Sequence, residues 1–236
     1  GIVVVGGSES GSGPQAFRWT AAGGLVGLGD LSGGAFQSHA TGVSANGSVI
    51  VGTGVNSSDE SRAFRWTSGS GLVALNPFFC LLCPNYGFGL SLSSNGLVAV
   101  GGSNDSDDTI EAARWTGGGT SISGLGHLSG GGDLSEARGA SSTGSVIVGA
   151  SDSTAGLRAF RWTTSGIGAL PDIPGMLVDA AANDVSDDGT VIVGNANNSP
   201  STTVQPHAVR WVGPGFASAQ LLGALPGASF PTSNAL

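Results

Sequence analysis

The sequence of 236 residues contains no Lys, and all eight of its basic residues are Arg. The 16 acidic residues give it a formal net charge of −8. Binding to nucleic acid or to an anionic membrane depends on basic groups that contact phosphates, so neither partner is expected. Only 10% of the residues are charged, and the Glu- and Lys-rich surfaces of typical helices are missing as well. These absences argue against a helical fold.

The sequence also lacks a long apolar run. Its most apolar stretch, PFFCLLCPNYGFGL at 77–90, is interrupted by Pro84 and Asn85 and is too short to cross a bilayer. We therefore expect no transmembrane segment. No signal peptide is visible, and because the chain starts at Gly1 rather than Met, we expect its ends to differ from those of the gene product.

Glycine, in contrast, is abundant, with 43 copies. Val, Ile, Thr, Trp and Phe occur in short runs, and Gly, Ser and Asn interrupt these runs. β-Branched and aromatic residues favour strands, whereas Gly, Ser and Asn favour turns. The composition therefore predicts short strands joined by tight turns.

Three elements recur five times in a fixed order. Each of the five Trp residues directly follows an Arg, and successive Trp residues are 47, 49, 47 and 49 positions apart. The pairs are Arg18-Trp19, Arg65-Trp66, Arg114-Trp115, Arg161-Trp162 and Arg210-Trp211. An apolar run that ends in Gly, such as GSVIVGT at 47, precedes each pair, and a Leu- or Ile-containing run, such as LVALNPFF at 72, follows it. A repeat of this length is typical of propeller blades.

One repeat predicts four strands. Its parts are the strand ATGVSA at 40–45, the turn Asn46-Gly47, the strand SVIVG at 48–52, a polar loop at 53–61, the strand RAFRWT at 62–67 and the strand LVAL at 72–75. We interpret Asn46-Gly47 as a two-residue hairpin turn with positive φ at both residues. A small four-stranded sheet has two apolar faces, and radial packing of such sheets buries both.

We therefore predict an all-β protein, a β-propeller of five four-stranded antiparallel blades of about 47 residues each. It is expected to form a single domain, 1–236, with repeats at approximately 1–46, 47–95, 96–143, 144–188 and 189–236. The last residues, SNAL at 233–236, align with the beginning of a first strand. We predict that the C-terminal strand pairs with the N-terminal GIVVVGG strand and closes the ring, which leaves no open edge.

The combined motif resembles the HAF repeat of bacterial extracellular proteins. AFRWT occurs at 16–20, 63–67 and 159–163, and it becomes AARWT at 112–116 and AVRWV at 208–212. The elements L-G-x-L-x-G-G and V-S-x-[DN]-G-x-V-I-V-G surround it, so the resemblance covers essentially the whole chain. It implies secretion or display at the cell surface and implies no particular activity. The strand order also resembles the kelch blade, which is a likeness of architecture only.

The Arg-Trp pairs allow two interpretations. Strand alternation places Phe17 and Trp19 on one face and Ala16 and Arg18 on the other. In the first interpretation the set is structural: Trp fills the space between blades, and Arg binds carbonyls or stacks on an aromatic ring. In the second, the guanidinium groups bind a carboxylated ligand. Packing is favoured, because it requires the same residues in every copy.

An acidic loop and a Cys pair are the candidate sites for metal and redox chemistry. Asp105, Asp107 and Asp108 lie in the loop between the second and third strands of the third copy, and clustered carboxylates can bind Ca²⁺. Their spacing matches no EF-hand loop, so a solvated loop is the simpler interpretation, and no other cofactor is expected. Cys80 and Cys83 are compatible with a local disulfide, a redox site or half a zinc site; the disulfide is favoured, because helix start and further ligands are not evident.

The same segment breaks the repeat with a group of apolar residues. The group consists of Phe78, Phe79, Leu81, Leu82, Tyr86 and Phe88. Exposed, these side chains would form a site for a partner or for self-association. Folded inward, they would close the mouth of the propeller channel. Both interpretations remain open.

No set of catalytic residues stands out, so we expect no enzymatic activity. The sequence predicts a secreted or cell-surface module with a structural, assembly or protein-interaction role. The alternative is a propeller that binds carbohydrate or another small ligand, as lectins do. A glycan hydrolase or lyase is the remote alternative, and it would require a carboxylate pair that the sequence does not single out.

Overall fold

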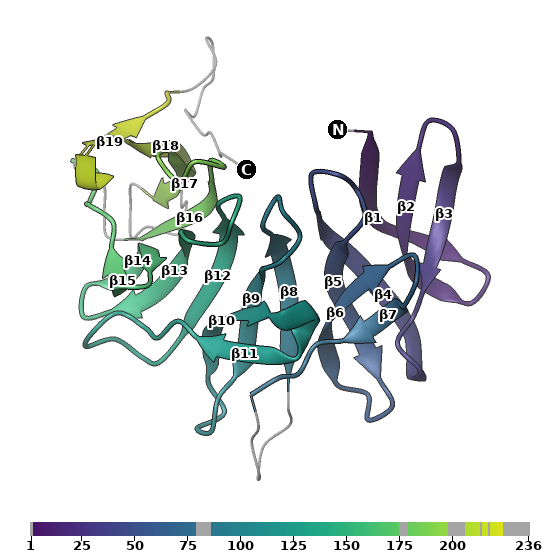
Figure 1. The fold of residues 1–236 in the computed structure, drawn as a ribbon. Coiled ribbons are helices and arrows are strands. Elements are labelled where there is room, and N and C mark those ends of the chain that lie inside the picture. Colours follow the sequence, from purple (N-terminus) through teal and green to yellow (C-terminus); the bar gives the residue numbers. More distant parts are fainter. Residues whose placement is uncertain are drawn as a thin grey trace. The chain divides into compact units, whose positions relative to one another are not determined.

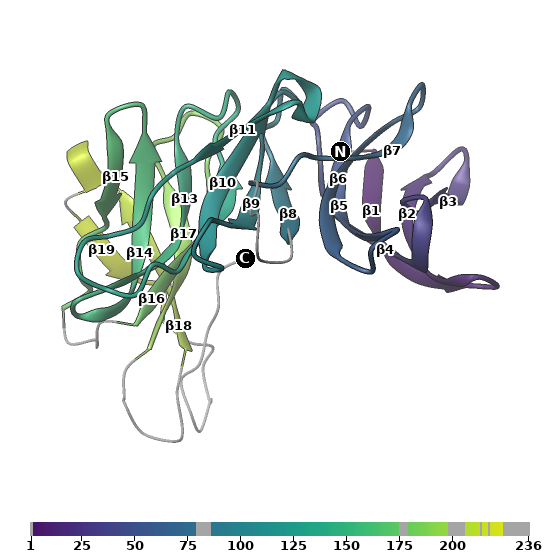
Figure 2. The same cartoon turned by 90° about the horizontal axis from the view of Figure 1, so that it is seen from below.

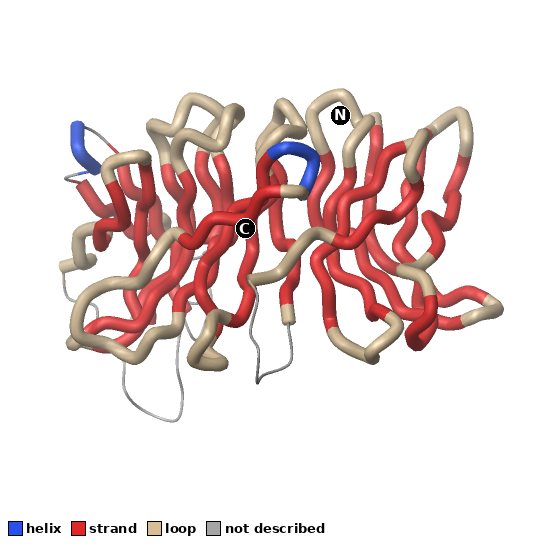
Figure 3. The backbone as a smooth tube through the Cα atoms, turned by 60° about the horizontal axis from the view of Figure 1, so that its bottom comes forward, coloured by secondary structure: helices blue, strands red, loops and turns tan. Residues whose placement is uncertain are grey.

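The computed structural model describes residues 2–78, 86–174, 179–197, 206–212, 214–216 and 218–223. The chain forms two compact units, Gly1–Gly124 and Leu125–Leu236. Together they contain five antiparallel sheets, each built from strands that follow one another along the chain (Figures 1 and 2). Helix in the described part of the chain is confined to two three-residue turns, η1 (Gly117–Gly119) and η2 (Pro214–Phe216) (Figure 3). The prediction of an all-β protein of five sheets is confirmed.

The first unit holds three of these sheets. Their strands are β1 (Val3–Ser10), β2 (Gly13–Thr20) and β3 (Gly24–Gly29); β4 (Gly33–Val43), β5 (Ile50–Asn56), β6 (Ser61–Thr67) and β7 (Gly71–Ala74); and β8 (Gly87–Leu92), β9 (Ala99–Asn104), β10 (Ile110–Thr116) and β11 (Ser121–Gly124). In each sheet the strands are hydrogen-bonded in chain order. Among the described residues, the first sheet has three strands rather than four.

The second unit holds two four-stranded sheets. Their strands are β12 (Ser135–Ala140), β13 (Ile147–Ser153), β14 (Gly156–Thr163) and β15 (Gly166–Ala169); and β16 (Ala180–Val185), β17 (Ile192–Asn197), β18 (Pro206–Val212) and β19 (Ser218–Leu221). The strand predicted to close the ring belongs to 224–236, outside the described residues. Ring closure and the single-domain assignment therefore stay predictions.

The glycine of the apolar run and the Phe of AFRWT are explained by one contact. Gly52 of β5 lies opposite Ala40 of β4 and opposite Phe64 of β6. A Cβ at Gly52 would overlap the carbonyl oxygen of His39, so only glycine allows the two backbones to approach. The Phe64 ring lies over the same Cβ position, as aromatic residues do opposite strand glycines. Gly149 and Phe160 repeat the arrangement in the fourth sheet.

The connection between the first and second strands differs from the prediction of a two-residue turn. In the second sheet it spans 44–49, and only Gly47 has positive φ, at +69°, whereas Asn46 does not. The Ser44 hydroxyl accepts the Val49 N–H (3.0 Å) and donates to the Asn46 side chain (2.8 Å). The connection is therefore wider than a two-residue turn, and the Ser44 side chain supports it.

The third and fifth sheets each bury the face that carries Trp against the preceding sheet of the same unit. Trp115 is 1% exposed and packs with Leu75, which follows β7 of the preceding sheet. Its indole N–H donates to the Asn76 carbonyl (2.6 Å), and Trp211 donates in the same way to the Pro171 carbonyl (2.9 Å). Trp19, in the first sheet along the chain, is 39% exposed, whereas Trp162 is 9% exposed. Trp115 and Trp211 thus link consecutive sheets by apolar contact and by one hydrogen bond each.

Replacement of Trp211 should separate these two contributions. Trp211→Ala leaves a large cavity and an unpaired Pro171 carbonyl, and should lower the free energy of unfolding by about 3–5 kcal/mol. Trp211→Phe keeps most of the apolar contact and should lose roughly 1–2 kcal/mol. Urea denaturation followed by circular dichroism measures both values. Equal losses for the two variants would contradict the role given to apolar packing.

Candidate functional site

The strand register places the Arg of each pair on the face opposite the Trp. Arg65, Arg114 and Arg161 lie opposite a Val of the second strand in their respective sheets. Within a unit this face points toward the following sheet. Arg18 Nε lies 3.4 Å from the Gly47 carbonyl of the second sheet. Arg161 extends toward Phe216 in the turn η2 of the fifth sheet. Arg18 and Arg161 are therefore placed at boundaries between sheets of the same unit.

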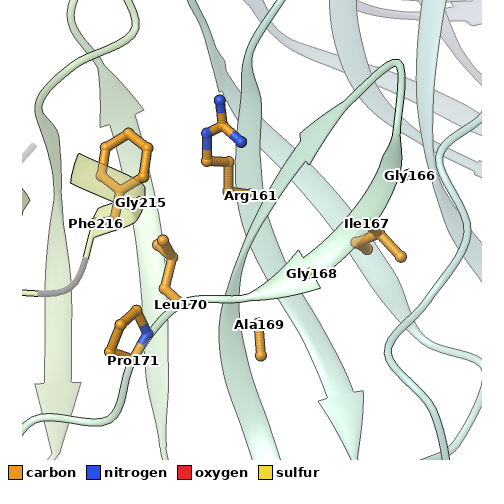
Figure 4. Close-up of a pocket in the computed structure, with 9 residues that line it drawn as sticks. All are labelled: Arg161, Gly166, Ile167, Gly168, Ala169, Leu170, Pro171, Gly215 and Phe216. Atoms are coloured by element: carbon orange, nitrogen blue, oxygen red, sulfur yellow. The ribbon is translucent and has the colours of Figure 1, made fainter.

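A pocket of about 300 Å³ surrounds Arg161 in the second unit. Figure 4 shows the Arg161 side chain between the Phe216 ring and strand β15. The guanidinium carbon lies 5.1 Å from the centre of the Phe216 ring, within the range of a cation–π interaction. The rest of the wall is formed by residues 166–171 and Gly215. One cation thus faces a wall of backbone and apolar groups.

Among the described residues, the Arg161 guanidinium has no carboxylate partner. No ion pair or hydrogen bond to it occurs among the described residues, and its Nε is buried without a partner there. The residues outside the described ranges contain neither Asp nor Glu. Arg158 and Arg138, in contrast, form ion pairs with Asp172 and Glu136. Arg161 therefore keeps its charge available to a ligand.

A second pocket of about 300 Å³ occupies the related position in the first unit. Arg18 and Trp66 line it together with Asn46, Gly47 and Ser48 of the turn between β4 and β5. Here the Arg18 Nε is directed at the Gly47 carbonyl. The two pockets show that the boundary between sheets can be hollow on the Arg side. At Arg210 the corresponding Nε donates to Gln220 (2.8 Å) on an exposed surface.

A third hollow, of about 420 Å³, shares part of β15 with the Arg161 pocket. Ile167, Gly168 and Ala169 line both. His127 and Arg158 contribute the basic groups of the third hollow, and His127 lies 3.4 Å from the Asp133 carboxylate. Strand β15 is thus bordered by two hollows, one with a single basic residue and one with two.

The apolar group predicted as a partner site is only partly described. Phe79, Leu81 and Leu82 lie outside the described residues, as do Cys80 and Cys83. Phe78 packs against the cluster around Trp115, and its N–H donates to the Ser103 hydroxyl (3.0 Å). Phe88 is half-buried against Gly102, whereas Tyr86 is 41% exposed. The described members therefore serve the third sheet, with Tyr86 alone on the surface.

The acidic loop of the third copy uses its first carboxylate internally. Asp105 Oδ1 accepts the N–H groups of Asp107 (2.9 Å) and Thr109 (3.1 Å), and Oδ2 accepts the Thr109 hydroxyl (3.0 Å). Slight burial raises the pKa of Asp105, but these hydrogen bonds outweigh it and lower the pKa below its usual value. Asp108 accepts from the Asn104 amide (3.0 Å). No group of three or more His, Cys, Asp or Glu suited to a metal occurs in the described ranges.

Another polar cluster lies on the first strands of the second unit. β12 and β16 each carry a bulge at the same place, and the bulged residues Arg138 and Asn183 are hydrogen-bonded (3.2 Å). Asp184 follows in β16. Desolvation raises the pKa of its carboxyl group, the Asp187 carboxylate adds to the rise, and the Val185 N–H opposes it. The cluster is a polar junction between two strands.

The fold is that of a β-propeller, as comparison with solved structures shows. TolB from Acinetobacter baumannii matches with a TM-score of 0.61 at 12% identity, over 99% of this chain and 52% of that one. A TolB-type protein of Agrobacterium tumefaciens matches with a TM-score of 0.56 at 12% identity, over 84% of this chain and 65% of that one. The chain thus spans about half and about two thirds of these proteins. Comparison with protein-family models and with curated proteins finds no match.

The predicted membership of the HAF-repeat family is wrong. The matching solved structures are TolB proteins, and no family model supports the HAF repeat. The motif that suggested it has a structural origin: Gly52 and Phe64 form a cross-strand contact, and Ser44 with Gly47 forms the turn. These residues have a packing role in the sheets, so the motif alone does not establish a family.

In the described part of the chain, no helix has the length and apolar character needed to cross a membrane.

Phe216 is the residue of the candidate site that sequence reasoning missed. It has φ of +57°, a conformation that is unusual for a bulky residue, and it is 7% exposed. Its segment reads WVGPGF at 211–216, whereas the other copies place small or polar residues after Trp. That single aromatic residue, behind a Gly-Pro-Gly turn, was the available signal.

The Asp105 loop predicts a pH-dependent stability difference. Asp105→Ala removes three hydrogen bonds to a carboxylate and should cost roughly 1–2 kcal/mol at pH 7. Because the folded-state pKa of Asp105 is lowered, the wild-type advantage is present above the unfolded-state pKa and is lost as the pH falls through the folded-state value. Urea titrations at pH 7 and at low pH measure the change. A Ca²⁺-dependent rise in Tm that Asp105→Ala abolishes would instead support calcium binding.

Asp184 predicts the opposite sign. Its raised pKa means that the folded state binds the proton more readily, so stability should rise as the pH falls through this range. Asp184→Asn keeps an acceptor for the Val185 N–H and removes the charge. The variant should therefore be more stable than wild type at pH 7 and equal to it near pH 3. A constant difference across this range would contradict the assignment to ionisation.

Proposed function

We propose that this chain is a non-enzymatic module that binds other proteins outside the cytoplasm. The observation that carries the proposal is the Arg161 guanidinium, held on an aromatic ring in an open pocket without a carboxylate partner among the described residues. A charge of this kind suits recognition of an acidic group on a partner. The pocket offers one cation, backbone and apolar groups rather than an acid–base pair, which favours binding over catalysis.

The proposed location rests on the two Cys residues. Cys80 and Cys83 are the only Cys of the chain, and their spacing suits a local disulfide. Such bonds persist in oxidising compartments and are rare in the cytosol. We therefore include a cell-envelope or extracellular location in the proposal.

Site-specific photo-crosslinking tests the binding role. A photoreactive phenylalanine is placed at Ile167, beside the Arg161 pocket, and at Ser68, beside the Arg18 pocket; Thr143, in an exposed turn, is the control position. Irradiation of the producing cells should yield discrete adducts with another protein from one or both pocket positions and none from Thr143. Absence of adducts from both, or the same adducts from Thr143, would overturn the proposal.

Self-assembly is the second candidate function. Strand β1 is hydrogen-bonded only to β2 among the described strands, so one edge of the first sheet is open there. An open edge can accept a strand from the same chain or from another copy. Native mass spectrometry across a concentration series distinguishes the two: a constant mass of 23.0 kDa excludes assembly, whereas a ladder of multiples supports it.

A further inference from the structure

The outer edge of the fourth sheet is formed by a short strand of small residues. β15 pairs with β14 and is the last strand of its sheet. Leu170 N–H donates to the Ala159 carbonyl, so the hydrogen-bonded pairs of this ladder include Arg161 with Gly168. In an antiparallel ladder the intervening residues direct their N–H and C=O groups away from the partner strand. The backbone groups of Ile167 and Ala169 therefore face outward.

No described strand pairs with this edge beyond β14, which leaves it open to an added strand. Gly166, Gly168 and Ala169 are exposed, and a Cβ at either glycine would meet no atom within 4 Å. A chain that approaches β15 therefore meets backbone groups with little side-chain obstruction. Edges of this kind accept extended segments by main-chain hydrogen bonding, while hollows beside the strand select the side chains.

The hollow around Arg161 favours a negatively charged group. Of the two hollows beside β15, Arg161 lines this one, held against Phe216, and Arg158 with His127 lines the other. Arg158 is already paired with Asp172, whereas Arg161 has no such partner among the described residues. A guanidinium that stacks by its face keeps its edge donors for a carboxylate. An acidic side chain of an added strand would therefore bind at Arg161.

We propose that β15 is the docking edge for an extended acidic protein segment, whose main chain pairs with Ile167 and Ala169 and whose carboxylate binds Arg161. This proposal rests on the protein-binding function proposed above and specifies the chemistry of the partner. The charge of Arg161 favours an acidic partner, and the open backbone of β15 favours an extended one. Together they indicate an extended acidic segment. A free small carboxylate would use the pocket alone and would not need the strand.

Two probes separate these occupants. The first is a capped peptide, acetyl-TVEVT-amide, with acetyl-TVQVT-amide as its uncharged match. The second is glutarate. Binding is followed by NMR from the Nε–Hε signals of the Arg residues, of which the chain has only eight, and from the amide signals of β15. The Glu peptide should shift the Arg161 signal and the β15 amides, and the Gln peptide should bind at least about tenfold more weakly.

Three variants locate the binding. Arg161→Gln removes the charge and should weaken the Glu peptide at least about tenfold. Ala169→Pro removes an outward N–H at an edge position that tolerates proline, and it should abolish peptide binding while glutarate still shifts Arg161. Arg210→Gln is the control, because Arg210 has the same repeat position on an exposed surface and should leave binding unchanged. Unchanged amide dispersion in each variant shows that the fold is intact.

Each contrary result has a defined meaning. Glutarate binding without peptide binding, or peptide binding that survives Ala169→Pro, overturns strand docking. Equal binding of the Glu and Gln peptides, or binding that survives Arg161→Gln, overturns the role of Arg161. If cells yield crosslinked partner proteins from Ile167 while the acidic peptide fails to bind, the protein-binding function stands and the acidic-strand proposal fails.

Discussion

Burial of the Trp face of one sheet against the preceding sheet is the interaction on which the architecture depends. A sheet of four short strands cannot bury two apolar faces by itself, so each needs a neighbour. Trp115 and Trp211 satisfy this need within their units by apolar contact and by an indole hydrogen bond to the chain that leaves the previous sheet. The bond fixes where the sheets meet, and the bulk of the indole fixes how closely.

The candidate site is a consequence of the same alternation. Since neighbouring residues of a strand face opposite ways, a Trp that faces back requires the preceding Arg to face forward. The forward boundary is less completely filled, and its character depends on the turn that the next sheet presents. Next to Arg18 the turn is polar, and next to Arg161 it presents the Phe216 ring. The Arg has a structural place in every copy. At Arg161 it becomes available for binding, because the following sheet presents a different turn there.

The repeat made the strands and their faces predictable, because spacing and alternation are local properties. Four of the five sheets have the predicted four strands, and Arg161 and Trp162 lie on opposite faces as expected. The turn was mispredicted because the Ser44 hydroxyl takes part in it, a contact that the Asn46-Gly47 pattern does not reveal. The Arg161 pocket was not predictable, since Phe216 reaches it from 55 positions away along the chain through the packing of two sheets. Family membership was mispredicted because the motif residues also serve packing within the sheets, so they do not by themselves identify a family.

The net charge determines how such a site would select its partner. A chain of charge −8 repels an acidic segment at long range, so electrostatic steering cannot draw the partner in. Attraction arises only within a few ångströms of Arg161, where the partner also forms main-chain hydrogen bonds with β15. Added salt screens the long-range repulsion more strongly than the contact between partly buried groups. Association should therefore become faster as salt rises from low to moderate concentration, the opposite of the behaviour of a basic binding surface. Specificity would therefore come from short-range contacts of the partner with the β15 backbone and the Arg161 guanidinium.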